Sequence, residues 1–135
     1  VFLQLDQMDD YIRRYGPKVR DQLVQGLARF LQRKVRQTDI MGLYGENLVA
    51  VVLEHLNDRD AARLTRRLQE EFASMDHPVA PGRSIRATFS AGIAMAAPQF
   101  KTLKDWIDAA LGALALARQF GTGRTILAGQ QIPEE

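Results

Sequence analysis

The amino-acid sequence predicts an α+β fold built on an antiparallel sheet. Two observations support this prediction. First, the chain contains short runs rich in Val, Leu and Ile, which are typical of strands. Second, these runs alternate with longer stretches in which apolar residues recur every three or four positions, a spacing typical of helices. The predicted strands are residues 1–5, 40–44, 48–56, 86–95 and 125–127. The predicted helices are residues 6–15, 17–36, 58–72 and 103–120.

The element order is β-α-β-β-α-β, followed by a further helix and strand. This is the split βαβ, or ferredoxin-like, arrangement, in which an antiparallel sheet has helices packed on one face. Palm domains of polymerases and nucleotidyl cyclases share this core. Because one fold hosts many functions, the function has to be inferred from individual residues.

Residues at the ends of the helices support these boundaries. Gly16 favours the left-handed exit of one helix, and Pro17 suits the first turn of the next. Asn57 and Thr102 each precede an acidic residue by three positions, which is the spacing of a helix N-terminal cap. Residues 74–84 are rich in Pro and Gly and are predicted to be a loop.

Length and composition indicate one globular domain, residues 1–135. The chain is 46% hydrophobic and 25% charged, and it has no Cys, which excludes a disulfide framework and a thiolate zinc site. No apolar run approaches the roughly 20 residues that a membrane-spanning helix needs. The chain begins in an apolar strand without an initiator Met, so we expect a domain excised from a longer protein that could include a membrane anchor.

The positive charges are concentrated in one residue type. Of 18 Lys and Arg residues only four are Lys, and the formal net charge is +2. Arg binds phosphate through two parallel hydrogen bonds, which Lys cannot do. The small net charge, together with predicted strands that lack exposed aromatic residues, argues against nucleic-acid binding and favours a local anion site.

Common catalytic and cofactor motifs are absent from the sequence. His55 alternates out of a predicted strand and His77 lies in the predicted loop, and neither has a set of partner ligands for a metal ion. There is no nucleophile elbow, Walker loop or dinucleotide-binding fingerprint. We therefore expect no metal and no cofactor.

Residues 43–53, which span the predicted hairpin, read LYGENLVAVVL. They resemble RYGGDEFAVVL, the signature of GGDEF domains, the diguanylate cyclases that make cyclic di-GMP from two GTP. Residues 15–21 are similar to its YGHxxGD segment, residues 87–94 to its VTVSIGVA strand, and residues 117–121 more weakly to its AKxxGR segment. The family's opening DxLTGLxNR helix is not found. The resemblance covers nearly the whole chain and implies the nucleotidyl-cyclase palm fold.

The same resemblance implies that the catalytic residues are lost. In the family, two metal ions bind GTP between an Asp of the first strand and an acidic residue of the hairpin turn, and both carboxylates are needed for two-metal chemistry. The first-strand position is Gln4, a neutral amide. The five motif positions are Gly45, Glu46, Asn47, Leu48 and Val49, so both motif acids are replaced and a negative charge stands where the phosphate approaches. We therefore expect no cyclase activity.

Two further positions bear on GTP binding. Asp6 matches a second acidic position of the first strand, but one carboxylate cannot bind two metal ions. By the resemblance, the Asn that reads guanine is replaced by Ile12, whereas its partner remains as Asp21. The guanine site is therefore only partly retained.

A separate product-binding motif of the family, RxxD, is retained. Arg36 and Asp39 match it at the family's distance from the hairpin, and the arginines that complete the site fall on Arg63 and Arg67. A guanidinium group can stack on a base and bind a phosphate, and a carboxylate can accept from adjacent ring donors. An RxxD sequence also occurs often by chance, and Arg67 can instead pair with an acidic residue of its own helix.

We expect a catalytically inactive, regulatory GGDEF domain that binds cyclic di-GMP in the bacterial cytoplasm. It would signal to a neighbouring domain, a protein partner or a second copy of itself. The alternative is a nucleotide-independent interaction or dimerisation module.

Overall fold

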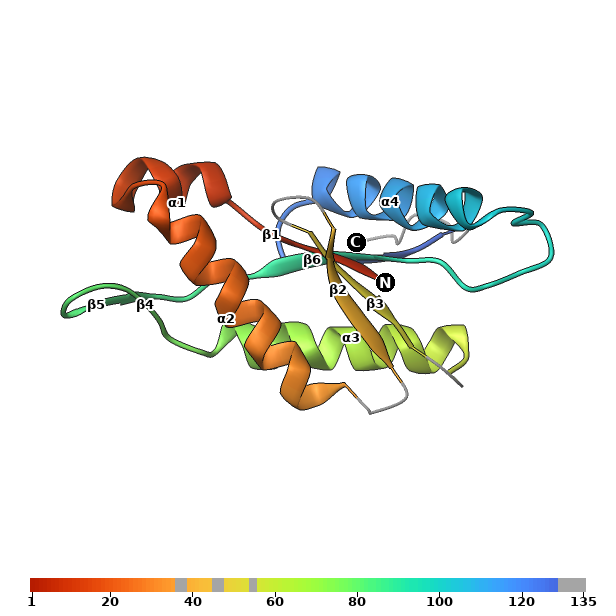
Figure 1. Cartoon of the computed structure of the whole chain (residues 1–135), viewed down its shortest axis with the longest axis horizontal. Helices are drawn as coiled ribbons and strands as arrows, with labels where there is room; N and C mark the ends of the chain where they lie inside the picture. Colours follow the sequence, from red (N-terminus) through yellow and green to blue (C-terminus); the bar gives the residue numbers. More distant parts are fainter. Residues whose placement is uncertain (36–38, 45–47, 54–55, 129–135) are drawn as a thin grey trace.

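A computed structural model gives the arrangement of the chain (Figure 1). It describes residues 1–35, 39–44, 48–53 and 56–128. Its strands are β1 (Phe2–Leu5), β2 (Ile40–Tyr44), β3 (Leu48–Val52), β4 (His77–Ala80), β5 (Arg83–Ile85), β6 (Phe89–Ile93) and β7 (Thr125–Leu127). Its helices are α1 (Met8–Tyr15), α2 (Lys18–Lys34), α3 (Asp58–Ala73) and α4 (Leu103–Gln119). Within these described parts, no helix combines the length and the apolar character that crossing a bilayer requires.

The central sheet has the strand order β2-β3-β1-β6-β7. Leu3 of β1 pairs with Val49 of β3 on one side and with Ala91 of β6 on the other, and both pairings are antiparallel. The first four strands in this order confirm the split βαβ arrangement. The fifth corrects the expectation of a purely antiparallel sheet, because β7 pairs in parallel with β6. The crossover through α4 makes this parallel pairing possible.

Helices pack around the sheet on both faces, as expected for the whole domain, whereas the split βαβ core alone covers one face. α2 and α3 pack on the face that carries Leu3, and α4 packs on the face that carries Phe2. Figure 1 shows α4 on one side of the sheet and α3 on the other. The prediction holds for the six-element core, and α4 belongs to the C-terminal addition. Since successive strand residues point to opposite faces, β1 contributes to both cores.

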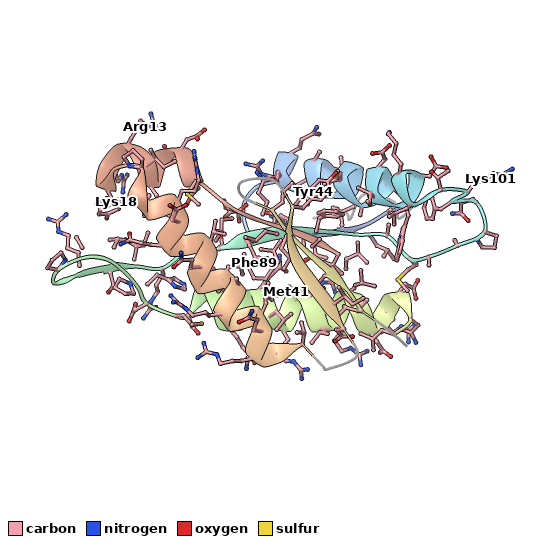
Figure 2. The ribbon with its side chains drawn as sticks, in the orientation of Figure 1. Arg13, Lys18, Met41, Tyr44, Phe89 and Lys101 are labelled. Carbon is pink, nitrogen blue, oxygen red and sulfur yellow. The ribbon has the colours of Figure 1, made fainter. Side chains whose placement is uncertain are left out.

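The larger core is centred on aromatic side chains from three elements. Phe72 of α3 lies 5.5 Å from Phe30 of α2 and 5.6 Å from Phe89 of β6, measured between ring centroids. Figure 2 labels Phe89. Edge-to-face and tilted contacts of this kind stabilise a core beyond the area they bury. They fix α2 and α3 against the sheet.

On the opposite face, α4 approaches β6 closely at Gly92. A Cβ atom at this position would lie 2.3 Å from the Ala110 carbonyl oxygen and 2.3 Å from the Leu114 nitrogen. Only a residue without a side chain fits between the strand and the helix backbone. Gly92 therefore sets the distance between α4 and the sheet.

The region predicted to be a loop, residues 74–84, contains most of a hairpin. β4 and β5 pair antiparallel and form a separate two-stranded sheet, which extends away from the central sheet in Figure 1. His77 and Val79 are buried, while Pro78 between them is exposed. This alternation is typical of a strand, and Pro is compatible with an edge strand. The prediction failed because the Pro and Gly content outweighed this short alternation.

Two predicted strands are shorter in the structure. β3 ends at Val52 instead of residue 56, and β6 covers Phe89–Ile93 instead of 86–95. Their common partner β1 has four residues, which limits the length over which either strand can pair with it.

Candidate functional site

Gln4 lies on the sheet face that α4 covers. Its Oε1 atom accepts a hydrogen bond of 3.0 Å from Nη1 of Arg118, so β1 is linked directly to the last turn of α4. Gln4 is half-buried and Arg118 is exposed. At the position that the resemblance assigns to a metal-binding carboxylate, a neutral amide binds a guanidinium group. A hard divalent cation prefers anionic oxygen ligands and gains none from this residue.

Asp6 is buried and serves as a hydrogen-bond acceptor. Its carboxylate accepts from Thr88 Oγ1 at 2.7 Å, from Ser90 Oγ at 2.8 Å and from the backbone N–H of Gly123 at 2.8 Å. These bonds join β1 to β6 and to the segment before β7. Both carboxylate oxygens are used, so the residue has a structural role that its position in the motif did not reveal.

The signature hairpin is only partly within the described residues. Gly45, Glu46 and Asn47 lie outside them. Leu48 is half-buried opposite Gln4, and Val49 is buried in the larger core. Across the described ranges, no three His, Asp or Glu side chains come together as a metal site would require.

The two positions that the resemblance assigns to guanine binding lie on α1 and α2. Asp21 is exposed in the first turn of α2. Ile12 of α1 is half-buried and packs against the larger core. The carboxylate is therefore open to solvent, whereas the position of the family's Asn contributes to apolar packing.

The RxxD motif lies between α2 and β2. Arg36 falls outside the described residues, and Asp39 is half-buried directly before β2. The end of α2 lies beside α3, because Nζ of Lys34 is 2.8 Å from Oε2 of Glu71. This ion pair holds the last residue of α2 beside the C-terminal half of α3.

Four arginines of α3 line one surface groove, which we call the α3 arginine groove. Its volume is about 650 Å³. Its lining consists of Asp58, Arg59, Ala62, Arg63, Arg66, Arg67 and Glu70 of α3 with Leu127 of β7. The structure therefore brings Arg63 and Arg67 together with Arg59 and Arg66, which flank them in the sequence of the same helix. Asp39 is not among the described residues that line the groove.

The guanidinium groups of this groove are not neutralised by carboxylates within the described part of the chain. Glu71, which could pair with Arg67 one turn away, pairs with Lys34 instead. Glu70 lines the groove without forming an ion pair with a described residue. Exposed guanidinium groups that lack a partner attract anions.

A second cavity, which the sequence did not predict, lies beside the start of α4. Its volume is about 420 Å³, and its mainly apolar lining includes Phe2, Tyr44, Leu103 and Trp106. The indole N–H of Trp106 donates to the Ala94 carbonyl at 2.8 Å, which fixes one wall. The lining comes from several separate strands and helices, so no local sequence pattern reveals it.

Comparison with known proteins identifies the family. Residues 1–124 match the family described as diguanylate cyclase, GGDEF domain. The chain belongs to the GGDEF domain family. The probable diguanylate cyclase DgcC of Escherichia coli K12 is 27% identical over 128 residues, which are 95% of this chain and 34% of that protein. This GGDEF domain thus spans about a third of the length of that relative.

Solved GGDEF domains have the same fold. The domain of DgcB from Caulobacter crescentus, solved in complex with cyclic di-GMP, superimposes with a TM-score of 0.87 at 18% identity and covers 96% of this chain and 76% of that one. The domain of PA1120 from Pseudomonas aeruginosa gives 0.87 at 21% identity, with coverages of 96% and 81%. The active GGEEF domain of a Vibrio cholerae diguanylate cyclase gives 0.83 at 20% identity, with coverages of 96% and 81%. These similarities confirm the predicted fold.

Proposed function

We propose that this GGDEF domain is a catalytically inactive receptor for cyclic di-GMP. It binds the dinucleotide through Arg36, Asp39, Arg63 and Arg67, and it regulates a neighbouring domain or a protein partner in the bacterial cytoplasm. The observation that carries the proposal is the α3 arginine groove, in which Arg63 and Arg67 are exposed together and form no ion pair with a carboxylate of the described residues.

The chemistry of these residues suits a cyclic dinucleotide. Each phosphodiester of cyclic di-GMP offers oxygens to a guanidinium group, and each guanine offers adjacent N–H groups to a carboxylate such as Asp39. The ion pair between Lys34 and Glu71 places the end of α2, which leads into Arg36, beside the helix of Arg67. The cyclic di-GMP complex of DgcB, a protein of the same fold, also favours this ligand.

The absence of catalysis follows from the residues that replace the carboxylates. Gln4 is hydrogen-bonded to Arg118, and Leu48 packs against the α4 face of the sheet. We expect the 135-residue chain to release no pyrophosphate from GTP with Mg²⁺ or Mn²⁺, because two metal ions need carboxylate ligands that these positions lack. An active diguanylate cyclase in the same assay is the positive control. Pyrophosphate release above background would contradict the proposal.

Isothermal titration with cyclic di-GMP tests binding directly. We expect a dissociation constant in the micromolar range or below. Substituting Arg36→Ala, Arg63→Ala or Arg67→Ala is expected to weaken binding by about tenfold or more, because each removes a charge-assisted hydrogen-bond donor. Arg83→Ala is the matched control, since Arg83 is an exposed arginine on β5 and is expected to leave the affinity unchanged.

Two results of this titration would count against the proposal. The absence of heat at high micromolar ligand would overturn it and leave nucleotide-independent interaction as the function of the domain. Binding that is insensitive to Arg63→Ala and Arg67→Ala would exclude the α3 arginine groove as the site.

A further inference from the structure

β2 forms an apolar outer edge of the central sheet. It pairs with β3 on one side, and no described strand pairs with its other side. Ile40, Leu43 and Tyr44 keep 63%, 65% and 43% of their surface exposed. The strand, IMGLY, has neither a charged residue nor a Pro, and its register with β3 is regular. Sheet edges that do not pair usually carry such features as charges, Pro or bulges.

The neighbouring strands determine which backbone groups of β2 face the free edge. Val51 of β3 exchanges two backbone hydrogen bonds of 2.8 Å with Val1, so its N–H and C=O point away from β2. Met41, which lies opposite Val51, therefore belongs to a non-hydrogen-bonded pair. In an antiparallel ladder the N–H and C=O of such a residue point to the other side, which here is the free edge. By the same alternation, those of Leu43 also point there.

We propose that β2 pairs antiparallel with β2 of a second copy of this chain, about a two-fold axis at Gly42. In this register Met41 of each copy lies opposite Leu43 of the other. The free N–H and C=O groups of these residues then form four intermolecular hydrogen bonds. Gly42 faces Gly42 in a non-hydrogen-bonded pair, where Cα atoms are about 4.5 Å apart and no side chain intervenes. This proposal names a specific interface for the dimerisation that the sequence analysis considered. The interface does not depend on cyclic di-GMP.

The side chains of β2 are complementary in this register on both faces. Ile40 lies opposite Tyr44 of the other copy, an aromatic pair with a β-branched residue that stabilises antiparallel sheets. Met41 and Leu43 form apolar pairs on the other face; Met41 and Tyr44 are labelled in Figure 2. Tyr44 also lines the cavity beside α4, so the apolar surfaces of the two copies meet along one face of the joined sheet.

A second copy suits this edge because β2 is complementary to itself about its central residue. Two-fold pairing satisfies the same groups on both chains and closes the assembly at two copies, as isologous interfaces do. The opposite edge of the sheet, β7, has only three residues and does not offer a comparable ladder. The two sheets then form one sheet in which β2 is no longer an edge.

Disulfide cross-linking tests the register. The chain has no Cys, so a single introduced Cys can form only an intermolecular disulfide. A Cβ atom at Gly42 meets no heavy atom within 4 Å, so Gly42→Cys leaves the monomer undisturbed. We expect oxidation to give a covalent dimer with Gly42→Cys and none with the matched control Ile40→Cys. Residue 40 lies opposite residue 44, and the offset of four residues separates the two copies of residue 40 by about 13 Å along the strands. No cross-link with Gly42→Cys, or an equal one with Ile40→Cys, would overturn the proposal.

Sedimentation measures the dimer without cross-linking. At about 1 mM, where a millimolar dissociation constant still leaves a large dimer fraction, we expect a mass above the 15.2 kDa of one chain. Leu43→Pro removes an N–H that faces the free edge and leaves the β2–β3 hydrogen bonds in place, so it is expected to be monomeric. Leu43→Lys is a second variant that keeps the backbone unchanged. Circular dichroism confirms that both remain folded.

Sedimentation tests dimerisation independently of the cyclic di-GMP titration. A monomeric wild-type chain at this concentration, or a dimer that persists in both folded variants, would overturn the proposal. Neither variant alters Arg63 or Arg67, so both are expected to bind cyclic di-GMP as the unmodified chain does. Failure of dimerisation and failure of ligand binding are therefore distinguishable.

Discussion

Gln4 of β1 and Asp6, which directly follows this strand, differ in what their surroundings allow them to do. Asp6 is buried and accepts hydrogen bonds from three donors, so replacing it would leave buried polar groups without partners. Gln4 accepts one hydrogen bond, from an exposed arginine. A motif alignment treats both as positions of lost or retained acids. Their hydrogen bonds show that the Asp6 carboxylate has a structural role and that the Gln4 amide binds an arginine.

His77 makes the stability of the domain depend on pH. Its ring lies 4.6 Å from that of Phe72 between centroids, and its Nε2 atom is buried without a hydrogen-bond partner in the described structure. Burial lowers the pKa of His77 below its usual 6.5, and the nearby Asp76 opposes this effect in part. The pKa is thus lower in the folded state than in the unfolded state, so protons bind preferentially to the unfolded chain. Stability is retained above about pH 6.5 and decreases as the pH falls through the folded-state pKa.

Urea unfolding at about pH 7.5 and 5.5 measures this dependence, because carboxylates titrate mainly below that range. We expect the free energy of unfolding to be lower at the acidic pH in the unmodified chain, and the decrease to shrink in His77→Phe, which keeps an aromatic ring beside Phe72. His55→Gln, at the only other histidine, is the control and should retain the decrease. An unchanged decrease in His77→Phe would exclude His77 as its source.

The packing of α4 on β6 depends on Gly92. In Gly92→Ala the new methyl group would meet the α4 backbone at Ala110 and Leu114, which cannot yield as a flexible side chain does. We expect a loss of about 3 kcal/mol in the free energy of unfolding, measured with urea. The matched control is Gly112→Ala on the exposed side of α4, where a Cβ meets nothing within 4 Å. This control is expected to stabilise the helix by about 0.8 kcal/mol, and a similar loss in both variants would contradict the interpretation.

Most elements were predictable from the sequence, because caps and apolar spacing act locally. The caps at Asn57 and Thr102 are confirmed, each side chain accepting from the backbone N–H three residues on. The β4–β5 hairpin was missed because Pro and Gly are typical of loops as well as of short edge strands. Gln69 was missed because its role is non-local: it is buried in α3 and donates to the carbonyls of Phe89 and Arg124.

Individual candidate residues are predictable from the sequence, but the side chains that surround them in the folded domain are not. Spacing along one helix was enough to place Arg63 and Arg67 on a shared exposed face. It did not reveal that Glu71 is engaged by Lys34 of another helix, which leaves Arg67 without that partner. The edge position of β2 could likewise not be predicted from the sequence, because pairings between distant segments determine the place of a strand in a sheet.

The central position of β1 has a consequence for how the protein is made. Among the described strands β1 is translated first, yet both of its partners come later: β3 at residues 48–52 and β6 at residues 89–93. One side of β1 therefore stays unpaired until most of the chain has been synthesised. Closing the long loop between β1 and β6 is slow relative to forming helices. The helices α1 and α2 can therefore form before β1 pairs with β6. The first of the described strands is therefore among the last to be fully paired.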